Sequence, residues 1–334
     1  MTQETRFMLT LVLGAALSAT AAAQTARNCA NLPATLDDTT VVVDALIGQA
    51  VFQPADGAFP LGGIDAVCIA ILDAKSMAAV SKGHTDAQGR FDLALRDPGN
   101  YILVADHAEL GEVATRVRIS GGTKDSAAEG GLLILFARRD QAGGNHTVQI
   151  THLELRRELV QMFQADQDIR NKLIQAGMAS PDPVLQARIG ELDAANTARL
   201  QELVAEYGWP DLALVGFDGA EAAFTLLQHA EYGVQKQLYP LLEAAYKSKG
   251  AAGQSYALLT DRILVKEGKP QIYGTQARPT QEWFNREPVF FDIEDEANVD
   301  QRRAEVGLQP LAKYAEMMRK AYFPADQSNQ SAGK

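Results

Sequence analysis

The chain has few cysteines, few aromatic residues and few histidines for its length. Of 334 residues, two are cysteine, five are histidine and 7% are aromatic. Because the histidines are few and scattered, a transition-metal site built from them is not expected. Positively charged residues are also fewer than negatively charged ones, since 31 Lys and Arg against 42 Asp and Glu give a net charge of −11. This deficit excludes the basic surface that nucleic acid or an anionic membrane would need.

Common catalytic and cofactor motifs are missing as well. The sequence has no H-E-x-x-H, G-x-S-x-G, G-x-x-x-x-G-K or C-x-x-C pattern, so it indicates neither a cofactor nor a metal. No segment is apolar over the roughly 20 residues that a membrane-spanning helix needs. The acidic run at 292–296 lacks the spacing of a calcium-binding loop and is interpreted as a solvated surface.

The N-terminus has the pattern of an export signal. Arg6 precedes the apolar stretch 7–17, and the alanines at 21–23 provide a small-residue cleavage site. We therefore predict a signal peptide over 1–23 and a mature chain that starts near Gln24. This chain would be exported to the periplasm or the extracellular space. The alternative interpretation is a buried first helix.

Export changes the interpretation of the two cysteines. Both Cys29 and Cys68 would remain in the mature chain and meet an oxidising compartment. A disulfide between them would tie the start of the mature chain to a strand and contribute about 3–4 kcal/mol. The alternative is a buried Cys68 and an unpaired Cys29.

The hydrophobic pattern changes along the chain from that of strands to that of helices. Between 40 and 137, apolar residues alternate with polar ones over short segments that turn signals separate, which is typical of an antiparallel β-sandwich. After a glycine-bearing linker at 138–151, apolar residues recur at helical spacing. We therefore predict a β-sandwich over 24–137, a mainly α-helical domain over 152–323 and a loose tail over 324–334. The linker predicts that the two domains fold separately.

The strand-rich part contains a recognisable hairpin pattern. It reads Thr85-Asp86-Ala87-Gln88-Gly89-Arg90-Phe91, followed by Pro98-Gly99-Asn100-Tyr101. Asp and Gly make the tight turn, and the aromatic residue anchors the next strand in the core. The pattern resembles the carboxypeptidase regulatory-like (transthyretin-like) β-sandwich. The resemblance implies a structural or adhesive module and no activity.

The spacing of apolar residues in the second part predicts its helices. They lie around 155–169, around 185–207, from 219 past Pro240, over about 251–267, and beyond Pro310. Gly233 and Pro240 are expected to bend the third of these helices.

Two predicted helices carry charged residues on faces that are otherwise apolar. In the second helix, Asp193 and Asn196 fall within the apolar stripe, and the nearly apolar fourth helix carries Asp261 and Arg262. A buried carboxylate needs a partner, because an unpaired buried ion costs several kcal/mol. We predict that Arg262 pairs with Asp193 through two parallel hydrogen bonds.

More polar side chains surround these positions. In the third helix, Gln228 and Gln235 lie two turns apart on one face, and His229 either edges a cleft or faces solvent. The segment 268–276 combines Pro and Gly with hydrogen-bonding side chains, as segments that line sites often do.

These residues carry a second resemblance. The segments, in chain order, are Tyr207-Gly208-Trp209-Pro210, Val215-Gly216, Gln228-His229-Ala230, Asp261-Arg262, Gln271-Ile272-Tyr273-Gly274-Thr275-Gln276, Asn298-Val299-Asp300-Gln301-Arg302-Arg303 and Gly307-Leu308. Over about 154–322 the chain resembles a bacterial family that is catalogued only as a domain of unknown function. The resemblance implies that these polar residues are a hallmark of the family, and it implies no activity.

Three functional hypotheses remain open. In an enzyme, His229 would be the general acid or base, oriented by Asp193 or Asp261. Arg262 and Gln276 would hold an anionic or carbonyl group. No serine or threonine is marked as an activated nucleophile. The alternative is a structural network of buried polar groups that only fixes helix packing.

The third hypothesis is a binding module for a small polar, sugar-like or peptide ligand, with Trp209 as a stacking platform. The ligand-binding residues would be Asp193, Asn196, Trp209, Gln228, Gln235, Tyr273 and Gln276. For either functional hypothesis we predict that six residues converge in space, namely Asp193, His229, Asp261, Arg262, Tyr273 and Gln276.

Overall fold

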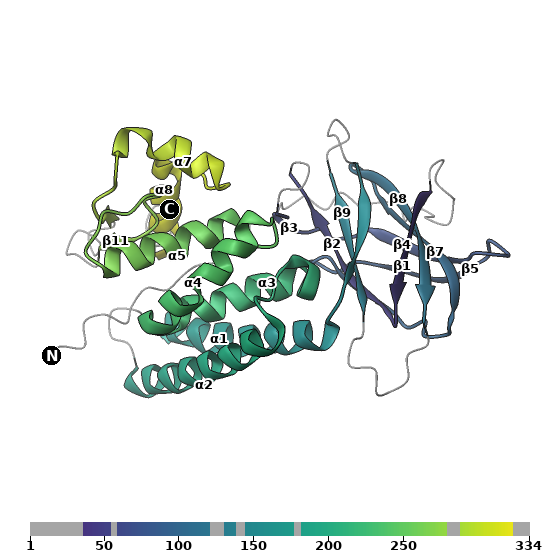
Figure 1. The fold of residues 1–334 in the computed structure, drawn as a ribbon, viewed down its shortest axis with the longest axis horizontal. Helices are drawn as coiled ribbons and strands as arrows, with labels where there is room; N and C mark the ends of the chain where they lie inside the picture. Colours follow the sequence, from purple (N-terminus) through teal and green to yellow (C-terminus); the bar gives the residue numbers. More distant parts are fainter. Residues whose placement is uncertain are drawn as a thin grey trace, which may run out of the picture. The chain divides into compact units, whose positions relative to one another are not determined.

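The computed structural model describes most of the chain. The described residues are 36–54, 59–120, 130–137, 144–176, 182–278 and 288–322. The predicted signal peptide, Cys29 and the predicted tail lie outside the described residues. A strand-rich region is followed by a helical region (Figure 1). Among the described residues, no helix has both the length and the apolar composition that crossing a membrane requires.

The chain divides into two compact units. Unit 1 consists of Met1–Ala230 together with Ser248–Gly250, and unit 2 consists of Glu231–Lys247 together with Ala251–Lys334.

Unit 1 begins with two five-stranded sheets. Sheet A has the strand order β1-β8-β7-β4-β5, and sheet B has the order β10-β9-β2-β3, with β6 also paired to β2. Residues from both sheets, among them Ile69, Leu103 and Ile134, belong to one hydrophobic core, so the two sheets pack face to face. The strands span β1 (Asp37–Val43), β2 (Leu46–Phe52), β3 (Gly62–Gly63), β4 (Cys68–Asp73), β5 (Ala79–His84), β6 (Arg90–Leu93), β7 (Gly99–His107), β8 (Gly111–Ile119), β9 (Gly131–Phe136) and β10 (His146–Ile150).

The two sheets are mixed, whereas the sequence predicted antiparallel strands. β1 runs parallel to β8, and β2 runs parallel to β9. The connection through Asp44 and Ala45 sends β1 and β2 to different sheets. Each strand therefore lies beside a strand from much later in the chain, and such a pair need not have the antiparallel direction of a hairpin.

The predicted linker at 138–151 contains a strand. β10 pairs with β9 along its whole length, and Ile150 is fully buried. The prediction failed here because a five-residue strand after two glycines shows too little alternation to be distinguished from a loop. α1 begins at Leu153, directly after this strand.

Helices α1 (Leu153–Ala176), α2 (Pro183–Tyr207) and α3 (Leu212–His229) also belong to unit 1. They lie side by side (Figure 1). The face of sheet B that points away from the sheet–sheet core packs against these helices, through Val51, Leu133, Leu135, Ile150, Leu153, Leu212 and Phe217. The division between the compact units therefore falls after Ala230 and not at the predicted linker, because the first helices bury an apolar face of the sheet.

The predicted third helix is two helices. α3 ends at His229, and α4 (Tyr232–Lys247) begins after Ala230, whose backbone is extended with φ −68° and ψ 162°. Pro240 lies inside α4, and Gly233 lies in its first turn. The remaining elements of unit 2 are α5 (Gly253–Lys266), β11 (Ala277–Arg278), β12 (Val289–Phe290), η1 (Glu296–Asn298), α7 (Val299–Glu305) and α8 (Leu311–Tyr322).

Candidate functional site

A buried histidine and a buried aspartate meet between α1 and α3. His229 Nδ1 lies 3.0 Å from Asp166 Oδ1, and the two side chains are 6% and 1% exposed. Asp166 also accepts hydrogen bonds from Arg170 Nε at 3.1 Å and from Gln167 Nε2 at 2.8 Å. Three groups, from His229, Arg170 and Gln167, therefore fix the orientation of the Asp166 carboxylate beside the imidazole ring.

Arg170 extends this cluster to α2. It lies one helical turn after Asp166 on the same face of α1, and its Nη2 donates to Asp193 Oδ1. Asp193 thus has a charged partner, as its place in the apolar stripe required. Arg170 is one described partner of Asp193, and the predicted pairing of Asp193 with Arg262 stays a prediction.

The charges around Asp166 favour its ionised form. Burial raises the pKa of this carboxyl, but the hydrogen bond and charge of His229 and the charge of Arg170 outweigh burial. The net result is a pKa below the ordinary value of 3.8. An ionised Asp166 accepts the Nδ1 proton of His229 and leaves Nε2 as the basic nitrogen of the neutral ring.

The Nε2 atom of His229 is the unusual feature of the cluster. It is buried and makes no hydrogen bond within the part of the chain that the structure describes. A buried polar atom without a partner costs about 1–3 kcal/mol, so such atoms in native proteins normally serve a ligand, a water molecule or a reaction.

A metal ion is an alternative occupant of the cluster. Ligand atoms of Asp166, Asp193 and His229 lie within 4.8 Å of one another. Arg170, however, donates to both carboxylates and already supplies the positive charge that a metal would bring. The arrangement therefore fits a hydrogen-bonded acid–base cluster better than a metal centre.

Asp261 organises a second polar cluster, which lies in unit 2. This fully buried carboxylate on α5 accepts hydrogen bonds from the backbone N–H groups of Ile272, Tyr273 and Thr275, at 2.7 to 3.2 Å. The Thr275 hydroxyl donates to it as well, at 2.9 Å. Burial raises the pKa of Asp261, and these hydrogen bonds act in the opposite direction. Asp261 therefore holds the loop 271–276, and its predicted catalytic role stays a prediction.

Two arginines of α7 hold the same loop from its carbonyl side. Arg303 is fully buried and donates from Nη1 to Tyr273 O at 2.6 Å and from Nε to Gln309 O at 2.6 Å. Arg302 Nε donates to Ile272 O at 3.0 Å. The loop is therefore fixed between a carboxylate at its N–H groups and guanidinium groups at its carbonyls.

The other predicted residues of unit 2 are largely interior. Gln276 is 3% exposed, and its Nε2 donates to Thr275 Oγ1 at 3.0 Å and to Leu258 O at 3.4 Å. Tyr273 packs edge-on against Tyr256 with ring centroids 6.4 Å apart. Gln235 is 3% exposed, and Arg262 is half-buried. This cluster resembles a packing network more than an open ligand site.

The predicted ligand residues of unit 1 are also buried. Trp209 is 8% exposed, and its use as a stacking platform stays a prediction. Asn196 on α2 is 7% exposed, and Gln228 next to His229 is 1% exposed. The convergence of the unit 1 residues with Asp261, Arg262, Tyr273 and Gln276 of unit 2 stays a prediction.

Sequence reasoning missed Asp166 and Arg170, and it assigned no role to Arg303 beyond its place in a segment of the family resemblance. Asp166 falls on the apolar stripe of α1, four residues after Met162 and three before Ile169. The argument that singled out Asp193 would therefore have found Asp166 too. Nothing in the sequence distinguishes Arg170 from the other arginines.

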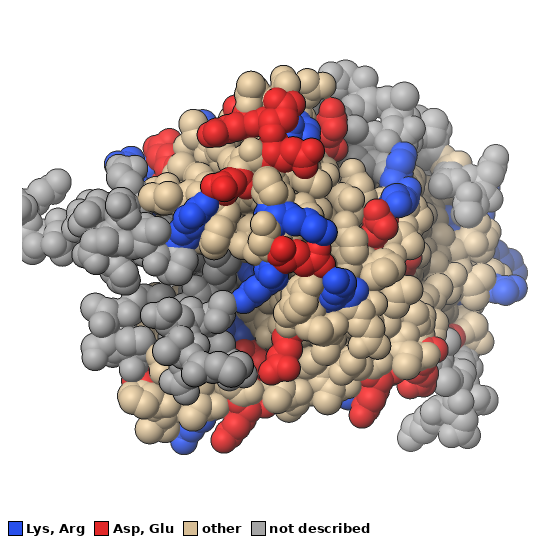
Figure 2. Space-filling model, turned by 60° about the vertical axis from the view of Figure 1, so that its left-hand side comes forward, with Lys and Arg blue, Asp and Glu red and all other residues tan. Residues whose placement is uncertain are grey.

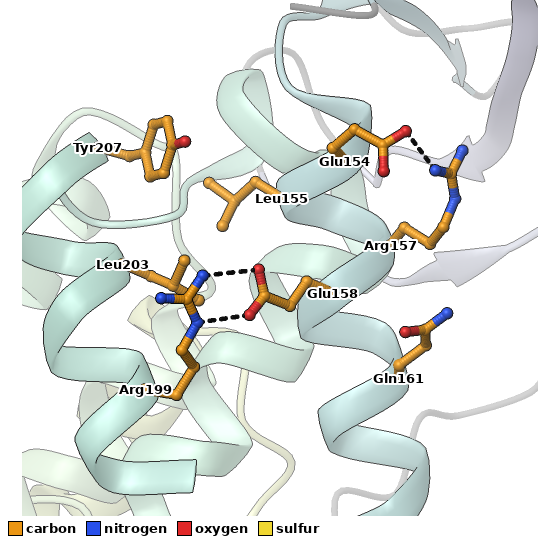
Figure 3. Close-up of a pocket in the computed structure, with 8 residues that line it drawn as sticks. All are labelled: Glu154, Leu155, Arg157, Glu158, Gln161, Arg199, Leu203 and Tyr207. Carbon is orange, nitrogen blue, oxygen red and sulfur yellow. Dashed lines mark hydrogen bonds and ion pairs between the residues drawn. The ribbon is translucent and has the colours of Figure 1, made fainter. Parts of the chain in front are cut away.

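A surface hollow of about 200 Å³ lies between α1 and α2 (Figure 3). Its charged groups pair with one another: Arg199 contacts Glu158 at 2.6 and 3.1 Å, and Arg157 contacts Glu154. Because these charged groups are exposed and already paired with one another, we expect the hollow to bind a ligand weakly.

Comparison with known proteins places the helical region in a family. Residues 153–324 match DUF6624, which is described as a family of unknown function. No curated protein matches the chain, and no solved structure does.

Proposed function

We propose that this chain, which belongs to the DUF6624 family of unknown function, binds a small polar ligand at His229. In this proposal, Nε2 of His229 accepts a proton or a hydrogen bond from the ligand. The observation that carries the proposal is the pairing of Nδ1 with the buried Asp166, while Nε2 is buried without a hydrogen bond among the described residues.

The chemistry follows from the two ring nitrogens. A carboxylate at Nδ1 selects the tautomer with a basic Nε2, holds the ring in place and stabilises the imidazolium that forms when Nε2 takes up a proton. Arg170 and Gln167 keep the Asp166 carboxylate ionised and oriented. The site would thus act as a hydrolase-like general base towards a ligand hydroxyl or a water molecule.

The charge distribution supports a small ligand over a polyanion. On the face drawn in Figure 2, Lys and Arg side chains lie next to Asp and Glu side chains, with wide uncharged areas between them. Interspersed charges do not produce the extended field of one sign that attracts polyanions. We propose a sugar-like or peptide ligand, whose hydroxyl or amide groups would hydrogen-bond to His229.

A ligand screen with His229→Gln tests the proposal. Sugars and short peptides are added to the wild type, and a true ligand at a hundredfold excess over its Kd should stabilise the fold by about 2.7 kcal/mol. His229→Gln should lose this stabilisation, while His84→Gln, which changes an exposed histidine on β5, should keep it. Equal stabilisation of the wild type and His229→Gln would place the ligand elsewhere. If no ligand stabilises the wild type and His229→Gln only lowers stability, the cluster is a packing network.

We also infer that the strand-rich part is a carboxypeptidase regulatory-like sandwich with a structural role. The geometry of the hairpin supports this inference, because Asp86 Oδ1 accepts hydrogen bonds from the N–H groups of Gln88 and Arg90 at 2.9 and 2.8 Å. Gly89 takes a positive φ of 75°, and Phe91 is buried at 5% exposure.

Export from the cytoplasm is a further part of the proposal. Cys68 is disulfide-bonded, which suits an oxidising compartment, and its pairing with Cys29 stays a prediction. Intact-mass measurement of protein from the native host should give a chain that starts near Gln24. A mass that retains residues 1–23 would contradict this.

A further inference from the structure

Helices α1 and α3 are joined at two places that match in spacing. Arg156 on α1 contacts Asp218 on α3, and further along both helices Asp166 contacts His229. The two contacts are ten residues apart on α1 and eleven residues apart on α3. At 1.5 Å per residue these spacings are about 15 and about 16 Å, so the helices run in the same direction with matched register.

The Arg156–Asp218 contact is a strong, oriented ion pair. Nε and Nη2 of Arg156 donate to the two oxygens of Asp218 at 2.7 and 2.9 Å. The side chains are 9% and 20% exposed. Two parallel hydrogen bonds between planar groups fix both distance and orientation, which a single point contact does not.

Sheet B anchors this pair. Gln49 on β2 is 1% exposed, its Oε1 accepts the backbone N–H of Asp218 at 3.3 Å, and its Nε2 donates to Gln88 O at 2.9 Å. The start of α3 is therefore attached to the sheet at the residue that binds Arg156.

Gly219 leaves room on α3 for the Arg156 side chain, since a Cβ there would lie 3.3 Å from Arg156 Cγ. Gly216 has φ +73°, which interrupts the helical backbone of α3, and a Cβ there would lie 2.8 Å from Ile150 of sheet B. The arginine stem therefore passes close to α3 at Gly219, and the backbone at Gly216 lies close to the sheet.

We propose that Arg156 and Asp218 are positioning residues that set the register of α1 on α3 and thereby bring Asp166 to His229. This inference rests on the proposed function of His229. A shift of one residue along either helix is 1.5 Å of rise with 100° of rotation, which is enough to break the 3.0 Å contact between Asp166 and His229. The strand-rich region then has a role in the site, because Gln49 on β2 fixes the position of Asp218, the partner of Arg156.

The Nδ1 proton of His229 provides the test, measured by NMR on the full-length protein. In Arg156→Met this proton should exchange with water at least about tenfold faster than in the wild type. The Arg156–Asp218 ion pair would no longer oppose the local separation of α1 from α3 that exposes the Asp166–His229 contact. Arg156→Lys, which keeps the charge but donates to one oxygen at a time, should give an intermediate rate. Arg157→Met, which changes an exposed arginine on the same helix, should leave the rate unchanged.

Each outcome has a separate meaning. An unchanged exchange rate in Arg156→Met overturns the inference and leaves the proposed function intact. If Arg156→Met does not fold, Arg156→Lys decides the question, and a wild-type rate in that variant overturns the inference. If the wild type shows no Nδ1 proton at all, the proposed function itself fails.

Discussion

Replacing Asp261 with alanine should lower the free energy of unfolding by about 3–5 kcal/mol, since it removes the acceptor of several buried donors. The backbone N–H groups of Ile272, Tyr273 and Thr275 would lose their partner inside unit 2. Urea unfolding measures the total loss, and hydrogen exchange at these three amides locates it. The amides should become the fastest-exchanging ones of the loop.

Asp292→Ala is the matched control for this change. The Asp292 side chain is 83% exposed and pairs with Arg278, and exposed ion pairs of this kind contribute about 0–1 kcal/mol. If Asp261→Ala is no more destabilising than Asp292→Ala, the loop 271–276 does not depend on the buried carboxylate. Asp261→Asn should fall between the two, because it retains one acceptor oxygen.

Replacing Asp166 with asparagine should lower the free energy of unfolding by about 1–3 kcal/mol at neutral pH, because His229 Nδ1 and Arg170 Nε lose a charged acceptor while Arg170 keeps its contact with Asp193. The cost should depend on pH. The pKa of Asp166 is lowered in the folded protein, so its contribution is complete above the unfolded value of about 3.9 and is lost as the pH falls through the folded value. The wild type and the variant should therefore approach equal stability in acid.

Unfolding of both proteins by urea at several pH values measures this difference. Asp168→Asn, which changes an exposed aspartate on the same helix, should follow the wild type at each pH. A difference between the wild type and Asp166→Asn that stays constant from neutral to acidic pH would show that Asp166 is not ionised in the folded protein.

The long helices could be predicted from the sequence because their apolar residues recur over many turns. Leu155, Leu159 and Ile169 mark α1, and Leu200 and Leu203 mark α2, as the structure confirms. The end of α3 at His229 could not be predicted in this way. Apolar residues continue at helical spacing through Val234 and Leu238, and only tertiary packing decides that Ala230 is extended.

The site shows the same limit. Periodicity revealed that Asp193 lies on an apolar face and needs a partner, because that property is local to one helix. It could not reveal that Arg170 contacts Asp193, because this contact depends on how α1 packs against α2. The parallel pairing of β1 with β8 and of β2 with β9 could not be predicted for the same reason, because each pair joins strands that are far apart in the sequence.

The most direct test of the account is the protonation of the His229 ring, read by long-range proton–nitrogen NMR. In the neutral ring, Nδ1 should carry the proton and Nε2 should be unprotonated, because the Asp166 carboxylate lies 3.0 Å from Nδ1. In Asp166→Asn this preference should weaken, and the Nδ1 proton should exchange faster. A wild-type ring that carries its proton on Nε2 would contradict this proposal, since the basic nitrogen would then be Nδ1, which faces Asp166, and Nε2 could only donate a hydrogen bond to a ligand.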